Sequence, residues 1–333
     1  MRYIILYSML LLVCVIGCQR QAAVEQHKTT SLPYAIENAY ATKDFLVCWS
    51  MLDKAVYVWR WADLQKDVSA KPKRYALEGV SCLAVAVVWP HALVDRDDYL
   101  VWLNLETGKD DWTQKIGPEF FTMDLRASPG GRYVAVRLAA NAGQDTDKYG
   151  VFDVDKQAVR WLAEREHHLP TNVAVTDDGK LLAVSNYPDN NDVLVLDVET
   201  GKTAMTAYAE DSAGLDSIMF SPDGKELWYG GTMAYLFSYD LGKRATTRKW
   251  LACRKDEPVY GHRMSSIGMS ADGKYVAAGT CANGELFIWN LADGSRRAYH
   301  LGKDRTVYSC VFSPDNKLAV ASTMTHLHII RLE

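Results

Sequence analysis

The chain has 333 residues, of which 48% are apolar and 23% are charged, and it carries a formal net charge of −4. These fractions are ordinary for a soluble globular fold. No basic run interleaved with aromatic residues is present, which argues against nucleic-acid binding.

The first 17 residues have the pattern of an export signal. Arg2 precedes an apolar run that extends to Gly17, and this run is shorter than the roughly 20 residues that span a membrane. Residues 15–18, Val-Ile-Gly-Cys, resemble the lipobox of bacterial lipoproteins, in which cleavage precedes the cysteine. The resemblance implies that Cys18 becomes the mature N-terminus and carries the lipid. An uncleaved membrane anchor is the alternative. Gln19, in place of Asp, implies sorting to the outer membrane.

Residues 18–32 are mostly polar and are predicted to form a tether between the lipid and the folded domain. Lipid anchoring of this kind is compatible with an otherwise soluble domain. Part of the same stretch is also a candidate for the outermost strand of the last structural repeat, because that repeat otherwise ends at its third strand.

A turn motif recurs along the chain at intervals of 43 to 49 residues. "SPDGKELWYG" starts at residue 221, and similar segments start at Ser128, Thr176, Ser270 and Ser313. In residues 221–224 the proline sets φ for a turn, and the glycine supplies the positive φ that completes it. Asn316 replaces this glycine in the last copy, and asparagine is the next most tolerant residue there. Each copy therefore predicts a hairpin of two antiparallel strands.

Seven runs of β-branched and aromatic residues form a second repeat. Each run is apolar on both faces, which is typical of strands covered from both sides. The runs align, at steps of 41 to 50 residues, on Arg60, Asn104, Asp153, Asp197, Asp240, Asn290 and Arg331. Four short strands in a period of this length indicate radially packed blades. We therefore predict an all-β fold, a single β-propeller of seven four-stranded blades over residues 33–333, and a monomeric ring.

One blade, from Gly261 to Asn290, resembles a WD40 repeat. Its Gly-His, Thr, Asn-Gly and Trp-Asn groups lie where that family has Gly-His, Ser/Thr, Asp-Gly and Trp-Asp. In the family, the His, Ser/Thr, Asp and Trp can form a hydrogen-bond chain that stiffens the blade. The resemblance implies the same role for His262, Thr280, Asn283 and Trp289, with Asn283 in place of a charged Asp.

Two other segments, residues 104–112 and 153–161, each place a tryptophan eight residues after an Asn or Asp. They resemble the docking motif of quinoprotein-type propellers, a group that includes the propeller lipoprotein of the outer-membrane β-barrel assembly machinery. This resemblance implies that Trp112 and Trp161 pack between neighbouring blades. The alternative is that both are outer-strand packing residues with no connection to a cofactor.

Five cysteines lie beyond the signal region, at positions 48, 82, 253, 281 and 310. An exported domain can oxidise its cysteines, and the loops that hold Cys253 and Cys281 are expected to meet on one face of a propeller. We therefore predict a Cys253–Cys281 disulfide. The alternative is that all five thiols are small buried apolar groups. No CxxC pair indicates a zinc site, and neither a metal nor a cofactor is predicted.

The loops between successive blades gather on one face of a propeller, around its central channel. In this chain they mix aromatic residues with charges of both signs, which suits protein recognition. The candidate partner contacts in these loops are Phe120, Phe121, His168, Asp211, Arg254, Tyr260, Arg263 and Arg305.

These features lead us to expect a non-enzymatic scaffold, lipid-anchored at the bacterial outer membrane, that binds an envelope protein partner. No Gly-x-Ser-x-Gly elbow and no complete phosphate-binding loop is present. The alternative is a propeller enzyme or small-molecule sensor of lactonase or quinoprotein type. Such a protein needs carboxylates or histidines that converge on the channel, and the inner strands offer only Asp216, near an entrance.

Overall fold

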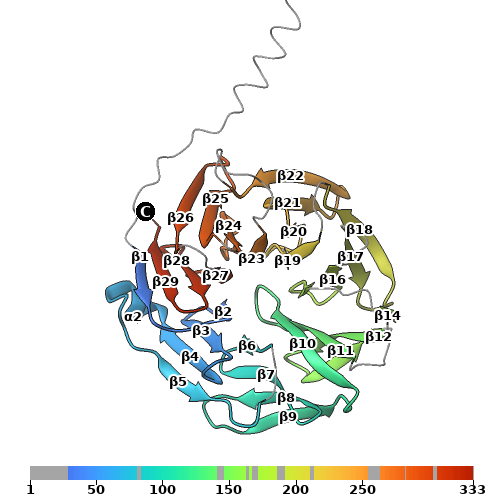
Figure 1. Cartoon of the computed structure of the whole chain (residues 1–333). Coiled ribbons are helices and arrows are strands. Elements are labelled where there is room, and N and C mark those ends of the chain that lie inside the picture. Colours follow the sequence, from blue (N-terminus) through green and yellow to red (C-terminus); the bar gives the residue numbers. More distant parts are fainter. Residues whose placement is uncertain are drawn as a thin grey trace, which may run out of the picture.

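The predicted all-β propeller is confirmed by the computed structural model, in which seven antiparallel sheets form the blades of a ring (Figure 1). The structure describes residues 29–80, 84–140, 146–162, 165–166, 172–185, 192–210, 214–253, 263–281, 283–302 and 306–332. Within these ranges the one helix is α2 (Trp61–Lys66), which lies between the third and fourth strands of the first blade.

The first four blades follow one another along the chain. Blade 1 contains β2 (Asn38–Ala41), β3 (Phe45–Ser50), β4 (Ala55–Arg60) and β5 (Lys73–Ala76). Blade 2 contains β6 (Ala86–Val88), β7 (His91–Arg96), β8 (Tyr99–Asn104) and β9 (Asp110–Lys115). Blade 3 contains β10 (Phe120–Ala127), β11 (Tyr133–Ala140), β12 (Thr146–Asp153) and β13 (Ala158–Trp161), with the short β14 (Arg165–Glu166) paired to β12. Blade 4 contains β15 (Val173–Val175), β16 (Leu181–Ser185), β17 (Asp192–Asp197) and β18 (Thr203–Tyr208).

The last three blades complete the ring. Blade 5 contains β19 (Leu215–Phe220), β20 (Glu226–Gly231), β21 (Tyr235–Asp240) and β22 (Ala245–Leu251). Blade 6 contains β23 (Met264–Met269), β24 (Tyr275–Thr280), β25 (Glu285–Asn290) and β26 (Arg296–His300). Blade 7 contains β27 (Val307–Phe312), β28 (Leu318–Thr323), β29 (Leu327–Arg331) and, from the other end of the chain, β1 (Thr29–Leu32).

The turn chemistry seen in the sequence sets the ends of the strands. All seven polar residues that align the second repeat are the last residues of third strands, namely β4, β8, β12, β17, β21, β25 and β29. The predicted hairpins are also present: Gly224 N donates to Ser221 O at 2.9 Å, and the other four copies make the equivalent bond. Gly224 has a φ of 67° and Asn316 a φ of 58°, so asparagine takes the conformation that glycine takes elsewhere.

The hydrophobic core is divided among the blade interfaces, because each middle strand is apolar on both faces. In β3, Leu46 and Cys48 pack in a cluster with blade 7 residues, whereas Val47 and Trp49 pack in a cluster with blade 2 residues. Five further clusters bury the remaining interfaces in the same manner. The two-sided apolar pattern in the sequence is thus explained by a blade on each side of every strand.

The ring is closed by a strand from the N-terminal side of the chain. β1 pairs antiparallel with β29, with Thr29 opposite Ile330 and Leu32 opposite Leu327. Blade 7 therefore has the outermost strand that the sequence analysis sought in residues 18–32, and the ring begins at Thr29 instead of residue 33. Pairing here covers the edge of β29 that would otherwise be exposed.

Polar contacts of the innermost strands join every pair of neighbouring blades. The blade 7–blade 1 contact is typical, since Ala39 N donates to Ser309 Oγ at 3.1 Å. The other contacts, in ring order, are Tyr40 Oη to Val85 O, Thr122 N to Asp95, Val173 N to Asp124, Asn172 to Asp216 O, Arg263 to Asp216, and Ser265 Oγ to Val307 O. Three of these hydrogen bonds, donated by Ala39 N, Thr122 N and Val173 N, are buried. They fix the blades relative to one another, because breaking a buried hydrogen bond leaves an unsatisfied polar group.

Candidate functional site

The direction of the strands defines two faces of the ring. The chain enters each blade at one face of the ring, and the first strand runs from there to the opposite face, where a turn leads to the second strand. We call the face with this turn the turn face; it holds the connections between first and second strands and between third and fourth strands. The opposite side is the loop face, which holds the connections between blades and between second and third strands.

On the turn face, four of the turns between first and second strands hold an Asp and a Lys that form an ion pair within the turn. In the turn before β20, Ser221 Oγ donates to Asp223 Oδ1 at 2.7 Å and Lys225 Nζ lies 3.3 Å from Asp223 Oδ2. Equivalent ion pairs join Asp178 to Lys180, Asp272 to Lys274 and Asp315 to Lys317.

These contacts favour the ionised form of the turn aspartates. Partial burial alone would raise the pKa of Asp272, but hydrogen bonds from Lys274 and from Ser270 Oγ outweigh it and lower the pKa to about 2. The pKa of Asp223 is lowered for the same balance of reasons. The turn-face carboxylates therefore serve the geometry of their own hairpins.

The loop face carries the exposed apolar side chains. Among the described residues, six large apolar side chains are exposed to solvent: Met51, Leu52, Tyr99, Met123, Tyr208 and Met324. Leu52 is 66% exposed between β3 and β4, and Met324 is 57% exposed between β28 and β29. Tyr99 begins β8 and Tyr208 ends β18, so both also lie at the loop-face ends of their strands.

Met123 completes this set from the innermost strand of blade 3, at a register shift in the half of β10 nearer the loop face. The six exposed side chains thus come from blades 1, 2, 3, 4 and 7, and all lie toward the same face of the ring.

The turn between β3 and β4, which carries Met51 and Leu52, is held in a defined shape. Met51 N donates to Glu37 Oε2 at 2.7 Å, and Tyr57 Oη donates to Asp53 Oδ2 at 2.8 Å. Burial raises the pKa of Glu37 above its ordinary value, although the bond from Met51 N opposes this shift. The turn therefore presents Leu52 from a backbone anchored by two carboxylates.

Of the predicted partner contacts, Phe120, Phe121 and Arg263 lie in the described part of the chain. Phe120 is only 7% exposed and packs in the core between blades 2 and 3, with Lys148 Nζ 4.0 Å from the centre of its ring. Its prediction as an exposed contact is therefore wrong, because β10 begins at this residue and turns its ring inward. Phe121 is partly exposed. Outside the described residues lie His168, Asp211, Arg254, Tyr260 and Arg305, together with Cys18 and His262.

Arg263 lies on the loop face and forms a two-pronged ion pair with Asp216. Its side chain is 54% exposed, whereas that of Asp216 is 8% exposed. Arg263 Nε and Nη2 donate to the two carboxylate oxygens, and Asn172 Nδ2 donates to the backbone oxygen of Asp216 at 2.6 Å. These contacts join blades 4, 5 and 6, and they hold the Asp216 carboxylate against the Arg263 guanidinium.

Thr280, Asn283 and Trp289, three of the residues in the hydrogen-bond chain implied by the WD40 resemblance, lie in the described part of the chain. Thr280 is fully buried, and its Oγ1 donates to Glu285 O and accepts from Glu285 N, each at 3.3 Å. Trp289 Nε1 makes no hydrogen bond to any residue that the structure describes. The Trp289 ring instead stacks on Trp250 of blade 5, with centroids 5.6 Å apart. Asn283 N donates to Cys281 O at 2.8 Å. Thr280 and Trp289 thus stabilise the blade through separate contacts.

The predicted disulfide is not formed between the described cysteines. Cys253 is buried just after β22, whereas Cys281 is partly exposed in the connection after β24, and no bond joins their sulfur atoms. The two cysteines lie in different environments, with Cys281 N held by Arg263 O at 2.7 Å. Cys48 and Cys310 are buried, as the alternative interpretation expects.

Trp112 packs between neighbouring blades, as the docking-motif resemblance implies. Its ring on β9 of blade 2 lies 5.0 Å from that of Phe152 on β12 of blade 3. Trp161 packs against the same cluster from the outer strand of blade 3.

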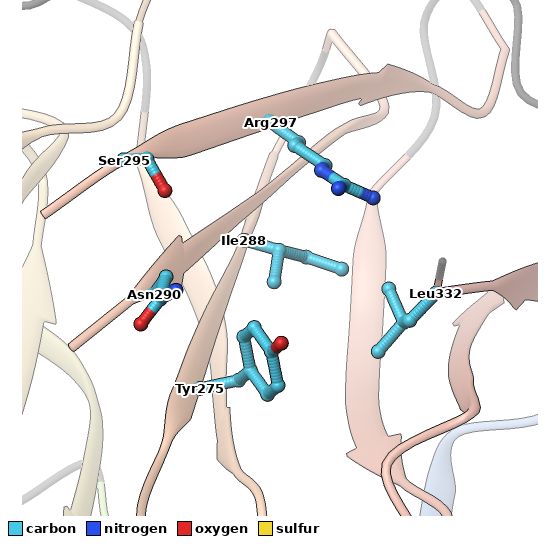
Figure 2. Close-up of a pocket in the computed structure, with 6 residues that line it drawn as sticks. All are labelled: Tyr275, Ile288, Asn290, Ser295, Arg297 and Leu332. Atoms are coloured by element: carbon cyan, nitrogen blue, oxygen red, sulfur yellow. The ribbon is translucent and has the colours of Figure 1, made fainter. Parts of the chain in front are cut away.

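A small pocket lies on the turn face, beside β24, β25 and β26 (Figure 2). It is lined by Tyr275, Ile288, Asn290, Ser295, Arg297 and Leu332, and its volume is about 60 Å³. Figure 2 shows the Arg297 side chain and Leu332 reaching toward the space above Tyr275. Sites for small molecules usually occupy about 300–1,000 Å³, so this pocket is too small to enclose a metabolite.

Within the described ranges, no three His, Cys, Asp or Glu side chains lie close enough together to hold a metal ion. None of the helices in those ranges has the length and apolar character needed to cross a bilayer.

No protein-family model matches the chain. Periodic tryptophan protein 2 of Arabidopsis thaliana is similar to it, with 23% identity over 163 residues. The matched region is 49% of this chain but only 17% of that protein, so the chain spans far less than the length of this relative. The distant similarity and the seven-bladed ring together support a WD40-like propeller.

The exposed apolar turns were not among the contacts predicted from the sequence. The predicted contacts lie in connections between blades, whereas Leu52 and Met324 lie in connections within blades. A signal was present, because a large apolar residue at a turn between two strands departs from the polar residues that usually occupy turns.

Proposed function

We propose that the protein is a non-enzymatic scaffold, lipid-anchored at the bacterial cell envelope, that binds a protein partner through its loop face. One observation carries this proposal: all six exposed large apolar side chains of the described residues lie toward the loop face, whereas four turns of the turn face carry paired charges. Methionine and aromatic residues are enriched in the centres of protein interfaces, and paired charges are not.

The ring supports this role mechanically. Seven apolar clusters and the polar contacts between innermost strands hold the blades in fixed positions. A surface that is already ordered loses little conformational entropy on binding, so more of its contact energy remains as affinity. A monomeric ring with side chains presented from short turns is suited to a scaffold.

The envelope location is part of the proposal and is supported by the sequence alone. Residues 1–17 have the pattern of an export signal, and residues 15–18 resemble a lipobox. Lipidation of Cys18 would attach the ring to a membrane, and Gln19 favours the outer membrane.

Site-specific cross-linking tests the proposal. A photo-reactive amino acid is placed at Leu52 or Met324 on the loop face, and at Lys225 or Lys243 on the turn face as matched exposed controls. We expect one envelope protein to be cross-linked from the loop-face positions at a yield at least several times that from the controls. We also expect its yield to fall when Leu52 and Met324 are both changed to Ser and the probe is placed at Tyr99.

Equal yields from both faces would contradict the assignment of the loop face. If no protein is cross-linked from either face and the purified ring retains a small molecule, the protein is instead a propeller enzyme or a small-molecule sensor.

A further inference from the structure

The strand that closes the ring has a defined direction relative to the two faces. β29 begins after Met324, at the loop face, and ends at Arg331, at the turn face. β1 is antiparallel to β29, and Thr29 lies opposite Ile330 near the end of that strand. The chain therefore enters the ring at the turn face, on the outermost strand of blade 7.

We propose that the turn face lies toward the membrane and that the loop face points away from it. This inference rests on the membrane attachment in the proposed function, and it holds for both a lipidated Cys18 and an uncleaved N-terminal anchor, because each precedes Thr29. It assigns the exposed apolar side chains to a protein partner instead of the lipid bilayer.

The length of the tether limits the alternatives. Ten residues separate Cys18 from Thr29, and they span at most about 35 Å when fully extended. As a flexible chain they would have an end-to-end distance of roughly 17 Å. A six-residue strand such as β28 is about 20 Å long. Placing the loop face on the membrane would therefore stretch the tether along the whole outer wall of blade 7, which costs chain entropy.

The chemistry of the turn face agrees with this orientation. Its exposed lysines lie beside aspartates in the same turns, as in the pair of Lys317 Nζ and Asp315 Oδ2 at 3.5 Å. Alternating charges of this kind are compatible with the hydrated layer next to lipid headgroups and do not insert into hydrocarbon. The apolar residues that could insert, Leu52 and Met324, are on the opposite face.

Energy transfer to labelled lipids tests the orientation in the full-length, membrane-attached protein. A single cysteine carrying a donor dye replaces an exposed residue at one end of a strand, and acceptor lipids are included in the vesicles. Two matched pairs are available: Lys43 and Leu52 at the two ends of β3, and Lys317 and Met324 at the two ends of β28.

The background carries Cys82→Ser and Cys281→Ser to remove other sites of labelling. The buried Cys48, Cys253 and Cys310 remain in place. Burial raises the pKa of the Cys48 and Cys310 thiols, that of Cys310 to about 12, and so keeps them unreactive at neutral pH.

We expect the donor at Lys43→Cys and Lys317→Cys to transfer energy to the lipids at least about twofold more efficiently than the donor at Leu52→Cys and Met324→Cys. Equal efficiencies within each pair would show that the ring has no preferred orientation and would overturn the inference. Higher efficiency from Leu52→Cys and Met324→Cys would also overturn it and would identify the apolar turns as lipid contacts.

Failure of the full-length protein to attach to vesicles would overturn the orientation together with the anchor. In the other two contrary outcomes, the protein is attached to the vesicles, so the proposed anchor is retained and only the orientation is overturned. The cross-linking experiment reports on the partner independently, since no partner is present in the vesicles.

Discussion

A close approach between blades 6 and 7 predicts the effect of a single methyl group. Gly268 lies on the innermost strand of blade 6, opposite Cys310 on the innermost strand of blade 7. A Cβ added at Gly268 would lie 2.0 Å from Cys310 O and 2.8 Å from its carbonyl carbon. The obstructing atoms belong to the backbone, so Gly268→Ala must push the two strands apart by about 1 Å. Overpacking a well-filled interior costs about 1–3 kcal/mol, and we expect the upper end of that range here.

Thermal and urea unfolding, followed by circular dichroism, measure this cost. A loss of about 3 kcal/mol lowers the melting temperature of a ring of this size by roughly 5 °C. Gly242→Ala is the control, because the nearest atom to its added Cβ is Asp240 Oδ1 at 3.4 Å, and it should change stability by less than about 0.5 kcal/mol. Adding Cys310→Ala to Gly268→Ala should not restore stability, since the Cys310 sulfur is farther from the added Cβ, at 3.2 Å. Equal stability of Gly268→Ala and Gly242→Ala would refute the close approach of the two strands.

Three other predictions concern the turns, the ring closure and the channel. The pKa of Asp272 is lowered from 3.8 to about 2 in the folded ring, so the stabilisation by its ionised carboxylate is complete above pH 4 and is lost as the pH falls toward 2. Asp272→Asn should therefore lower the free energy of unfolding at pH 7 by about 1 kcal/mol, a value reduced because the side chain is partly exposed. The variant should also show a weaker loss of stability between pH 4 and pH 2 than the unmodified protein. Deleting residues 1–32 should expose the edge of β29 and cause concentration-dependent association in analytical ultracentrifugation, whereas deleting residues 1–28 should leave a monomer. Arg126 Nη1 donates to Asn38 Oδ1 at 3.3 Å and so joins blade 3 to blade 1, and the Asp124 carboxylate raises the pKa of Arg126. Arg126→Ala should lower the free energy of unfolding in urea by about 1 kcal/mol. An unchanged free energy of unfolding would show that this contact is not formed.

The fold could be predicted from the sequence because its signals are local and repeated. The turn before β20 needs a positive φ at Gly224, and the same need recurs in four other copies with the same spacing. The polar residue at the end of each third strand could be predicted because it begins a turn at the edge of a buried strand. These signals depend on neighbouring residues only, so no knowledge of the ring was needed.

The site could be predicted only in part, because exposure depends on contacts between distant residues. Phe120 lies in a stretch that looks like a surface loop, yet its ring is covered by blades 2 and 3. Leu52 lies between two apolar strands and looks like core, yet the turn that holds it projects from the ring. Arg263 lies on the face that holds the connections between blades, as the sequence predicts, but its ion pair with Asp216 joins residues 47 positions apart.

The pairing of β1 with β29 has a mechanical consequence. A force that pulls on the N-terminal segment runs parallel to β1, so the four paired residues resist it in shear, with all their backbone hydrogen bonds loaded together. Because the strand that takes this load also completes blade 7, its removal would break the pairing between residues about 300 positions apart and expose the edge of β29. A pull on the N-terminal segment would thus act first on the same four residues that complete blade 7.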